Sequence, residues 1–197
     1  MSVIVAIKDK SRIVVGVDVR MSCGESYTDS YVRRPKAIHI NDKKDIIVGG
    51  VGNIGLVDIL KQIIAEYQEE DVYAIDRAWI VKYIVPELSI TIRNYGMADR
   101  DGKMDGSLIL AIKDRAYIIA GNYVVEEIVE YTADGSGKDA ALGSLYTTNK
   151  MAMTPEEKIK IAIESAGSCV CTVSKMSYIG DTTGKMFLTS AIENKQK

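Results

Sequence analysis

The beginning of the chain constrains the fold more than any other stretch. Two short runs rich in apolar, β-branched residues, 2–7 and 13–20, are separated by the polar segment 8–12. This pattern predicts a buried strand, a turn and a second strand. A buried hairpin at the start of the chain favours a fold whose core is a β-sheet.

Ser2 is a candidate nucleophile because of its place on this first strand. Once Met1 is removed, which a small second residue normally permits, the α-amine and the hydroxyl of Ser2 lie together at the strand tip. An α-amine titrates near pH ~8, so near neutrality a sizeable fraction of it can act as a base toward the hydroxyl. The arrangement is that of an N-terminal nucleophile enzyme.

Composition predicts one globular domain over residues 1–197. Hydrophobic residues make up 47% and charged residues 26% of the chain, which are ordinary values for such a domain. The net charge of −2 gives no electrostatic reason to bind nucleic acid or an anionic membrane. No run approaches the ~20 apolar residues of a membrane span, and the start lacks the layout of a secretory signal. A cytoplasmic protein is therefore expected.

The three cysteines, Cys23, Cys169 and Cys171, do not suggest a metal site. Their number is odd, their spacing is not that of paired metal ligands, and the single histidine lies far from them in the sequence. Cys169 and Cys171 alternate in an expected strand over 168–173, where free cysteine usually packs as a small hydrophobe. The glycine-rich turn 49–53 lacks the Gly-Lys-Ser/Thr ending of a phosphate-binding loop. Neither a metal nor a cofactor is expected.

The remaining elements follow one another in groups. Further strands are expected at 36–40, 45–48, 107–112, 116–120 and 186–191, with a turn at 180–184. Helices are expected at 56–67, at 73–84 with Pro86 ending or kinking the helix, after Gly137, and from Thr154 to Gly167 with Glu157 completing a capping box. The segment 21–35 is expected to be irregular. Strands, two helices, strands, two helices and strands predict an α+β fold with antiparallel sheets between helical layers.

Several short motifs occur in a fixed order along the chain. They are Ser2 with Asp18-Val19-Arg20, Lys36-Ala37-Ile38-His39-Ile40, Gly49 to Gly52, Gly135-Ser136-Gly137 and Met153 to Glu157. In this order and spacing they resemble the proteasome β-subunits and their bacterial relative, the HslV peptidase, over most of the chain. The resemblance implies an N-terminal nucleophile (Ntn) hydrolase with a four-layer αββα sandwich.

The resemblance also implies catalytic roles. Ser2 would be the nucleophile and its α-amine the base, acting through a water. Lys36 would lie close to Ser2, where its positive charge favours the basic form of the amine. Asp18 would hold Lys36, and Arg20 would pair with the carboxylates around it.

Gly49 and Ser136 would complete this site. The backbone N–H of Gly49 would donate to the developing oxyanion, and Ser136 would support the amine. The chain departs from the family pattern at two positions. Ser2 stands where the family usually has threonine and lacks the β-branch that restricts the rotamer. Ser168 aligns where many members have an aspartate that supports the amine network.

The residues expected to bind substrate form a mainly apolar pocket. They are Met21, Ser22, Ile38, Ile47 and Val51, with Arg34 at the edge. Such a pocket favours an apolar side chain before the cut bond.

The leading interpretation is a threonine-peptidase-like endopeptidase in a serine variant. Many copies would form a homo-oligomeric ring that encloses the active sites and cuts polypeptides through an acyl-enzyme ester, with an AAA+ ATPase unfoldase as a candidate partner. A non-catalytic, ring-forming structural homologue is the alternative, and a retained Met1 would favour it because a blocked amine cannot serve as the base. An amidase for small molecules on the same fold is a third interpretation.

Overall fold

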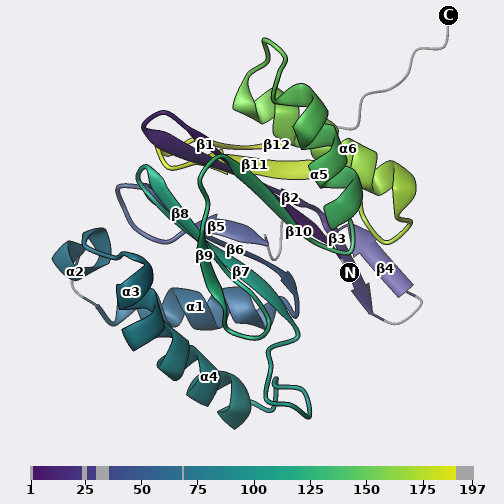
Figure 1. Ribbon diagram of the computed structural model, residues 1–197. Helices are drawn as coiled ribbons and strands as arrows, with labels where there is room; N and C mark the ends of the chain where they lie inside the picture. Colours follow the sequence, from purple (N-terminus) through teal and green to yellow (C-terminus); the bar gives the residue numbers. More distant parts are fainter. Residues whose placement is uncertain (1, 24–25, 30–35, 68, 190–197) are drawn as a thin grey trace, which may run out of the picture.

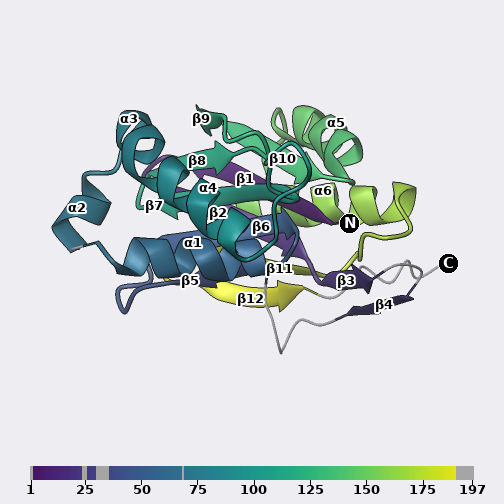
Figure 2. The same ribbon diagram turned by 90° about the horizontal axis from the view of Figure 1, so that it is seen from below.

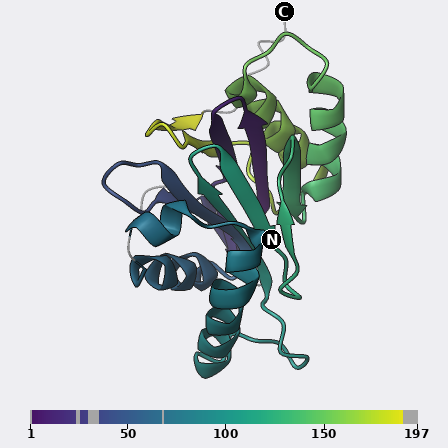
Figure 3. The same cartoon turned by 60° about the vertical axis from the view of Figure 1, so that its left-hand side comes forward.

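Two five-stranded antiparallel sheets lie face to face, and helices cover the outer face of each (Figure 1). The computed structural model describes residues 2–23, 26–29, 36–67 and 69–189. Figure 3 shows the layers from another side, with one group of helices at each outer face. The expected α+β fold, a four-layer αββα sandwich, is confirmed.

The first sheet contains the N-terminal strand in its interior. Its strands, in spatial order, are β10 (Tyr131–Gly135), β1 (Val3–Asp9), β2 (Arg12–Asp18), β11 (Ser177–Asp181) and β12 (Met186–Thr189). The expected opening hairpin is present, because β1 pairs antiparallel with β2. Helices α5 (Lys138–Thr148) and α6 (Pro155–Cys169) cover the outer face of this sheet.

The second sheet carries the glycine-rich segment. Its strands, in spatial order, are β5 (Ala37–His39), β6 (Ile46–Gly52), β7 (Gly106–Ile112), β8 (Arg115–Ile119) and β9 (Val125–Glu127). Its outer face is covered by α1 (Gly55–Ala65), α2 (Glu69–Tyr73), α3 (Arg77–Trp79), the π-helix η1 (Ile80–Ile84) and α4 (Val85–Asn94). None of the helices in the described ranges is long and apolar enough to cross a membrane.

Apolar side chains fill the space between the layers in the two-residue period of a strand. Ile4 of β1 packs between the sheets with Ile47 and Ile109. Its neighbours Val3 and Val5 pack on the opposite face of β1, in the cluster formed with α5 and α6. Successive side chains of a strand point to opposite faces, so β1 serves two cores at once.

The polar segment after β2 forms a hairpin where an irregular stretch is predicted. Strands β3 (Arg20–Cys23) and β4 (Ser26–Asp29) pair antiparallel in a small sheet of their own. Figure 2 shows this hairpin extending from the end of the sandwich at which the chain begins. The prediction failed because each strand spans only four residues, so neither forms an apolar run that is distinguishable from the polar residues around it.

The helical segment before residue 95 is longer than predicted. It does not end near Pro86, because α4 continues to Asn94. Pro86 lies in the first turn of α4, directly after η1, where the missing N–H of proline breaks no regular helical hydrogen bond. The expected start at 73 is also wrong, since Tyr73 ends the separate helix α2.

The last long helix continues past Gly167. Thr154 is its N-cap and forms the predicted capping box with Glu157, and the helix runs from Pro155 to Cys169. The predicted strand 168–173 is therefore wrong. Both Cys169 and Cys171 are exposed and do not pack in the core. The predicted turn 180–184 is shifted as well, since β11 continues to Asp181.

Candidate active site

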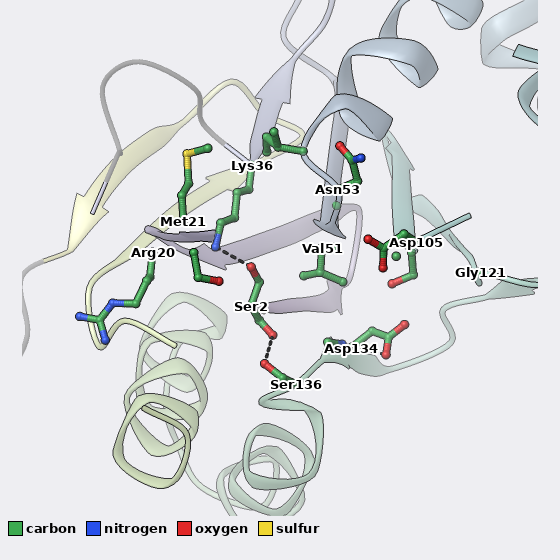
Figure 4. Close-up of a pocket in the computed structure, with 17 residues that line it drawn as sticks. Ser2, Arg20, Met21, Lys36, Val51, Asn53, Asp105, Gly121, Asp134 and Ser136 are labelled. Carbon is green, nitrogen blue, oxygen red and sulfur yellow. Dashed lines mark hydrogen bonds between the residues drawn. The ribbon is translucent and has the colours of Figure 1, made fainter. Parts of the chain in front are cut away.

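Ser2 lies at the start of β1, beside a cavity of about 860 Å³ (Figure 4). Only 4% of its surface is exposed. Its carbonyl oxygen accepts hydrogen bonds from the Ser136 hydroxyl (3.2 Å) and from the Gly137 N–H (3.3 Å). The turn between β10 and α5 therefore fixes the backbone of Ser2. Ser136 lies beside Ser2, but the hydrogen bond of its hydroxyl goes to the carbonyl oxygen, and its support of the amine stays a prediction.

Lys36 contacts the hydroxyl of Ser2. Its Nζ donates to Ser2 Oγ at 2.7 Å and to Asp18 Oδ1 at 2.8 Å. Lys36 is only 5% and Asp18 only 1% exposed, so this ion pair is shielded from water. A positive charge within hydrogen-bond distance of a hydroxyl oxygen stabilises negative charge that develops there. The structure thus brings Ser2, Asp18 and Lys36 together.

Backbone groups hold the Asp18 carboxylate in place. Oδ1 accepts from the Val3 N–H at 2.9 Å, and Oδ2 accepts from the N–H groups of Arg20 (3.0 Å) and Ser174 (3.2 Å). These donors offset the cost of burying a charge. Ser174, which lies before β11, is a site residue that sequence reasoning missed, because its contribution is a backbone N–H that no side-chain pattern reveals.

Arg20 connects two segments at the edge of the site. Its guanidinium donates to the Cys171 carbonyl oxygen at 2.8 Å, which joins β3 to the segment after α6. Its predicted pairing with carboxylates stays a prediction. Ser168 does not reach the site, because it is exposed on α6 and its hydroxyl donates to the Glu164 carbonyl oxygen at 2.8 Å.

Gly49 lies behind the cavity and not on its wall. It pairs with Ala37 of β5 and with Ile109 of β7, whereas Gly50 lines the cavity. The Gly50 N–H donates to the Lys36 carbonyl oxygen at 2.9 Å, toward β5. Because hydrogen-bonding groups alternate along a strand, the Gly49 N–H points the other way, toward β7.

The predicted substrate-binding residues separate into two groups. Met21, Ser22 and Val51 line the cavity. Ile47 is fully buried between the sheets, and Ile38 packs against the core on the helical side of its sheet, so neither forms the wall. Arg34 lies outside the described residues, as does Met1.

The cavity is less apolar than predicted. Asn53, Asp105 and Asp134 line it in addition to Met21 and Val51. Sequence reasoning missed these three because each lies at a strand end that only the pairing of distant strands brings to the site. Across the part of the chain that the structure describes, no cluster of three His, Cys, Asp or Glu side chains could hold a metal ion.

The chain is similar to known proteins both in sequence and in structure. The sequence model of the family described as "Proteasome subunit" matches residues 2–171. Thiobacillus denitrificans BPH in complex with epoxomicin is similar in structure, with a TM-score of 0.73 and 17% identity, covering 96% of this chain and 98% of that chain. A second structure of T. denitrificans BPH gives a TM-score of 0.72 at 17% identity, covering 98% of this chain and 100% of that one.

Eukaryotic HslV from Trypanosoma brucei has a TM-score of 0.68 and 18% identity, covering 91% of this chain and 98% of that chain. A search of curated protein sequences gives no significant match. At these identities, the structural likeness shows a shared fold.

Proposed function

Because the chain belongs to the proteasome subunit family, we propose that it is a peptidase that uses Ser2 as an N-terminal nucleophile once Met1 has been removed. The observation that carries this proposal is the 2.7 Å contact between Lys36 Nζ and Ser2 Oγ, with Asp18 holding the lysine from the other side. Since the buried pair of Lys36 and Asp18 is directed at the Ser2 hydroxyl, it does more than connect two strands.

The proposed reaction forms and then hydrolyses an ester at Ser2. Ser2 Oγ attacks the carbonyl carbon of a peptide bond while its proton passes, through a water, to the α-amine of Ser2. The C–N bond then breaks, the proton goes to the departing amine, and the acyl group stays on Oγ. Attack by water on this ester releases the acid and restores the hydroxyl. A peptide-bonded nitrogen has no basic lone pair, which is why Met1 must first be removed.

The negative charge on the attacked carbonyl oxygen needs a donor. The resemblance assigns this role to the Gly49 N–H, and that assignment stays a prediction. The orientation of this N–H toward β7 and the place of Gly50 on the cavity wall count against it. Lys36 supplies a second stabilising interaction, because its ammonium lies next to Ser2 Oγ, the attacking oxygen.

We further propose that the enzyme works as a cytoplasmic, self-compartmentalising homo-oligomeric ring that degrades polypeptides, with an AAA+ ATPase as a candidate unfoldase. Family membership and the similarity to an HslV structure support this proposal. Size-exclusion chromatography with light scattering should show a large homo-oligomer, and a monomer across micromolar concentrations would contradict the compartment.

Intact-mass spectrometry tests the nucleophile. The purified protein should lack the mass of one methionine, and an electrophile of the β-lactone or epoxyketone type should add its mass at Ser2. The Ser2→Ala variant should fold, because the hydroxyl is not part of an apolar core, and should take up no label. A fully retained Met1 together with no labelling would refute the enzymatic function and favour the non-catalytic ring-forming homologue.

A further inference from the structure

The cavity beside Ser2 has walls of opposite charge. Arg20 and Lys36 lie on one side of it, and Asp105 and Asp134 lie on the other side, beyond Val51 (Figure 4). This separation gives the cavity an electrostatic direction. An inference about substrate follows from it and rests on the proposed peptidase function.

The Asp105 carboxylate is exposed at the cavity, but its backbone is held firmly. Its carbonyl oxygen accepts the Asn53 N–H at 2.8 Å. Gly52 and Gly106 have φ of +88° and +146° and bring the ends of β6 and β7 so close together that a Cβ on either would overlap backbone atoms. Within the described ranges, no hydrogen bond or ion pair to the Asp105 side chain is present. The carboxylate is therefore placed by the fold and remains available to a ligand.

Asp134 contributes a second carboxylate from the other sheet. It lies on β10 opposite Ile4, and its Oδ1 accepts the Gly135 N–H at 2.8 Å. Lys138 Nζ lies 3.9 Å from the same oxygen, at the edge of ion-pair distance, and half of its side chain is exposed. An ion pair this exposed and this long neutralises the carboxylate weakly.

Ser107 supplies an independent indication of a ligand. It lines the same cavity, yet only 4% of its surface is exposed, and its Oγ is buried without a hydrogen-bond partner in the described part of the chain. Buried hydroxyls are normally hydrogen-bonded, because leaving one unpaired is unfavourable. A ligand that carries N–H donors into the cavity would satisfy this oxygen.

We propose that Asp105, Ser107 and Asp134, here called the acidic wall, bind a lysine or arginine side chain of the polypeptide substrate. Both side chains carry a positive charge and several N–H donors, which suit two carboxylates and an unpaired hydroxyl. Repulsion from Arg20 disfavours the reversed placement of such a chain, whereas the charge of Lys36 is offset by its ion pair with Asp18. The structure thus assigns a cationic preference to a pocket that the sequence predicts to be apolar.

Binding to a non-cleaving protein tests the acidic wall without relying on turnover. Fluorescein-labelled peptides would carry lysine at one position and norleucine, a neutral side chain of similar length, in the matched peptides, with the position moved along the peptide. Fluorescence anisotropy with the Ser2→Ala protein should show tighter binding of the lysine peptide at one register. Replacing either carboxylate, as in Asp105→Asn or Asp134→Asn, should weaken that binding about fivefold and leave the norleucine peptide unaffected.

Asp101→Asn is the matched control. Asp101 lies in the same connection, is exposed, and pairs with Lys103 at 3.5 Å, but it does not line the cavity. This variant should bind both peptides as the parent does. Equal affinity for lysine and norleucine peptides at every register, or an equal loss with Asp101→Asn, would overturn the proposal. Cleavage assays on the protein with Ser2 intact separate the two proposals, since cleavage without a cationic preference refutes only the acidic wall.

Discussion

The Asp18 carboxylate should stabilise the fold more than Lys36 does, although the two form one ion pair. Asp18 joins segments that are far apart in the sequence, because its oxygens accept N–H groups from Val3, Arg20 and Ser174 in addition to Lys36 Nζ. Lys36 adds to this cluster a single charged donor. Substituting the two residues separately therefore divides the structural role of the cluster from its proposed catalytic role.

The expected magnitudes follow from the hydrogen bonds that each substitution breaks. Asp18→Asn keeps one oxygen as an acceptor and replaces the other with an NH₂ group. Each Asp18 oxygen accepts two hydrogen bonds, so two N–H or ammonium donors then face the NH₂ group and lose their acceptor. Either substitution leaves one charge of the buried pair without its countercharge, which costs about 3–5 kcal/mol. For Asp18→Asn the donors left unpaired add about 1–3 kcal/mol each. Lys36→Met leaves the carboxylate its three backbone donors, so its free energy of unfolding should fall by the ion-pair cost alone.

Urea unfolding at a fixed protein concentration measures both losses, since the proposed assembly would make apparent stability depend on concentration. Labelling of Ser2 by the electrophile gives the catalytic readout on the same samples. Lys36→Met should remain folded and lose labelling by orders of magnitude, because no ammonium is left beside the Ser2 hydroxyl. The reasoning is refuted if Lys36→Met destabilises the protein as much as Asp18→Asn, or if Lys36→Met is labelled at the parent rate.

Two other predictions concern acid stability and the backbone of Ser2. Burial raises the pKa of Asp181, but hydrogen bonds from Thr183, Lys185 and Arg12 outweigh this effect and hold the pKa below 3.8. The contribution of the Asp181 carboxylate to folding stability is therefore present above about pH 4 and is lost as the pH falls through its folded-state pKa. Urea midpoints between about pH 5 and 2 should therefore fall less steeply for Asp181→Asn than for the parent. An added Cβ at Gly135 (φ +97°) would overlap the Ser2 carbonyl oxygen, whereas one at Gly96 (φ +66°) would meet no atom within 4 Å. Both alanine variants should lose about 1–2 kcal/mol from the left-handed backbone, but only Gly135→Ala should slow labelling of Ser2.

The layers of the fold could be predicted because apolar residues recur along the sequence with the periods of strands and helices. The run that forms β1 and the capping box at Thr154 are local signals, and both are present in the structure. Local signals also explain the errors. Pro86 marks a helix end in isolation, yet it is accommodated in the first turn of α4, and Gly167 is accommodated inside α6.

The contact of Ser2 with Lys36 could be predicted only through the resemblance to a family. The two residues are 34 positions apart and share no local pattern. Ser174 was out of reach because its contribution to the site is a backbone N–H, and a backbone group has no sequence signal. Asp105 lies just before β7 and Asp134 lies on β10 of the other sheet, so their place at one cavity depends on how these two strands are arranged.

The residues of β6 show why the pocket was predicted with the wrong chemistry. Side chains two residues apart on a strand point to the same face, so Ile47, Gly49 and Val51 all face the other sheet. Val51, near the end of β6, lines the cavity, whereas Ile47 is fully buried between the sheets. The two-residue period identifies the face of a side chain but not how far along the strand the cavity reaches. The proposed acidic wall is built from the ends of β7 and β10, which no period in β6 could predict.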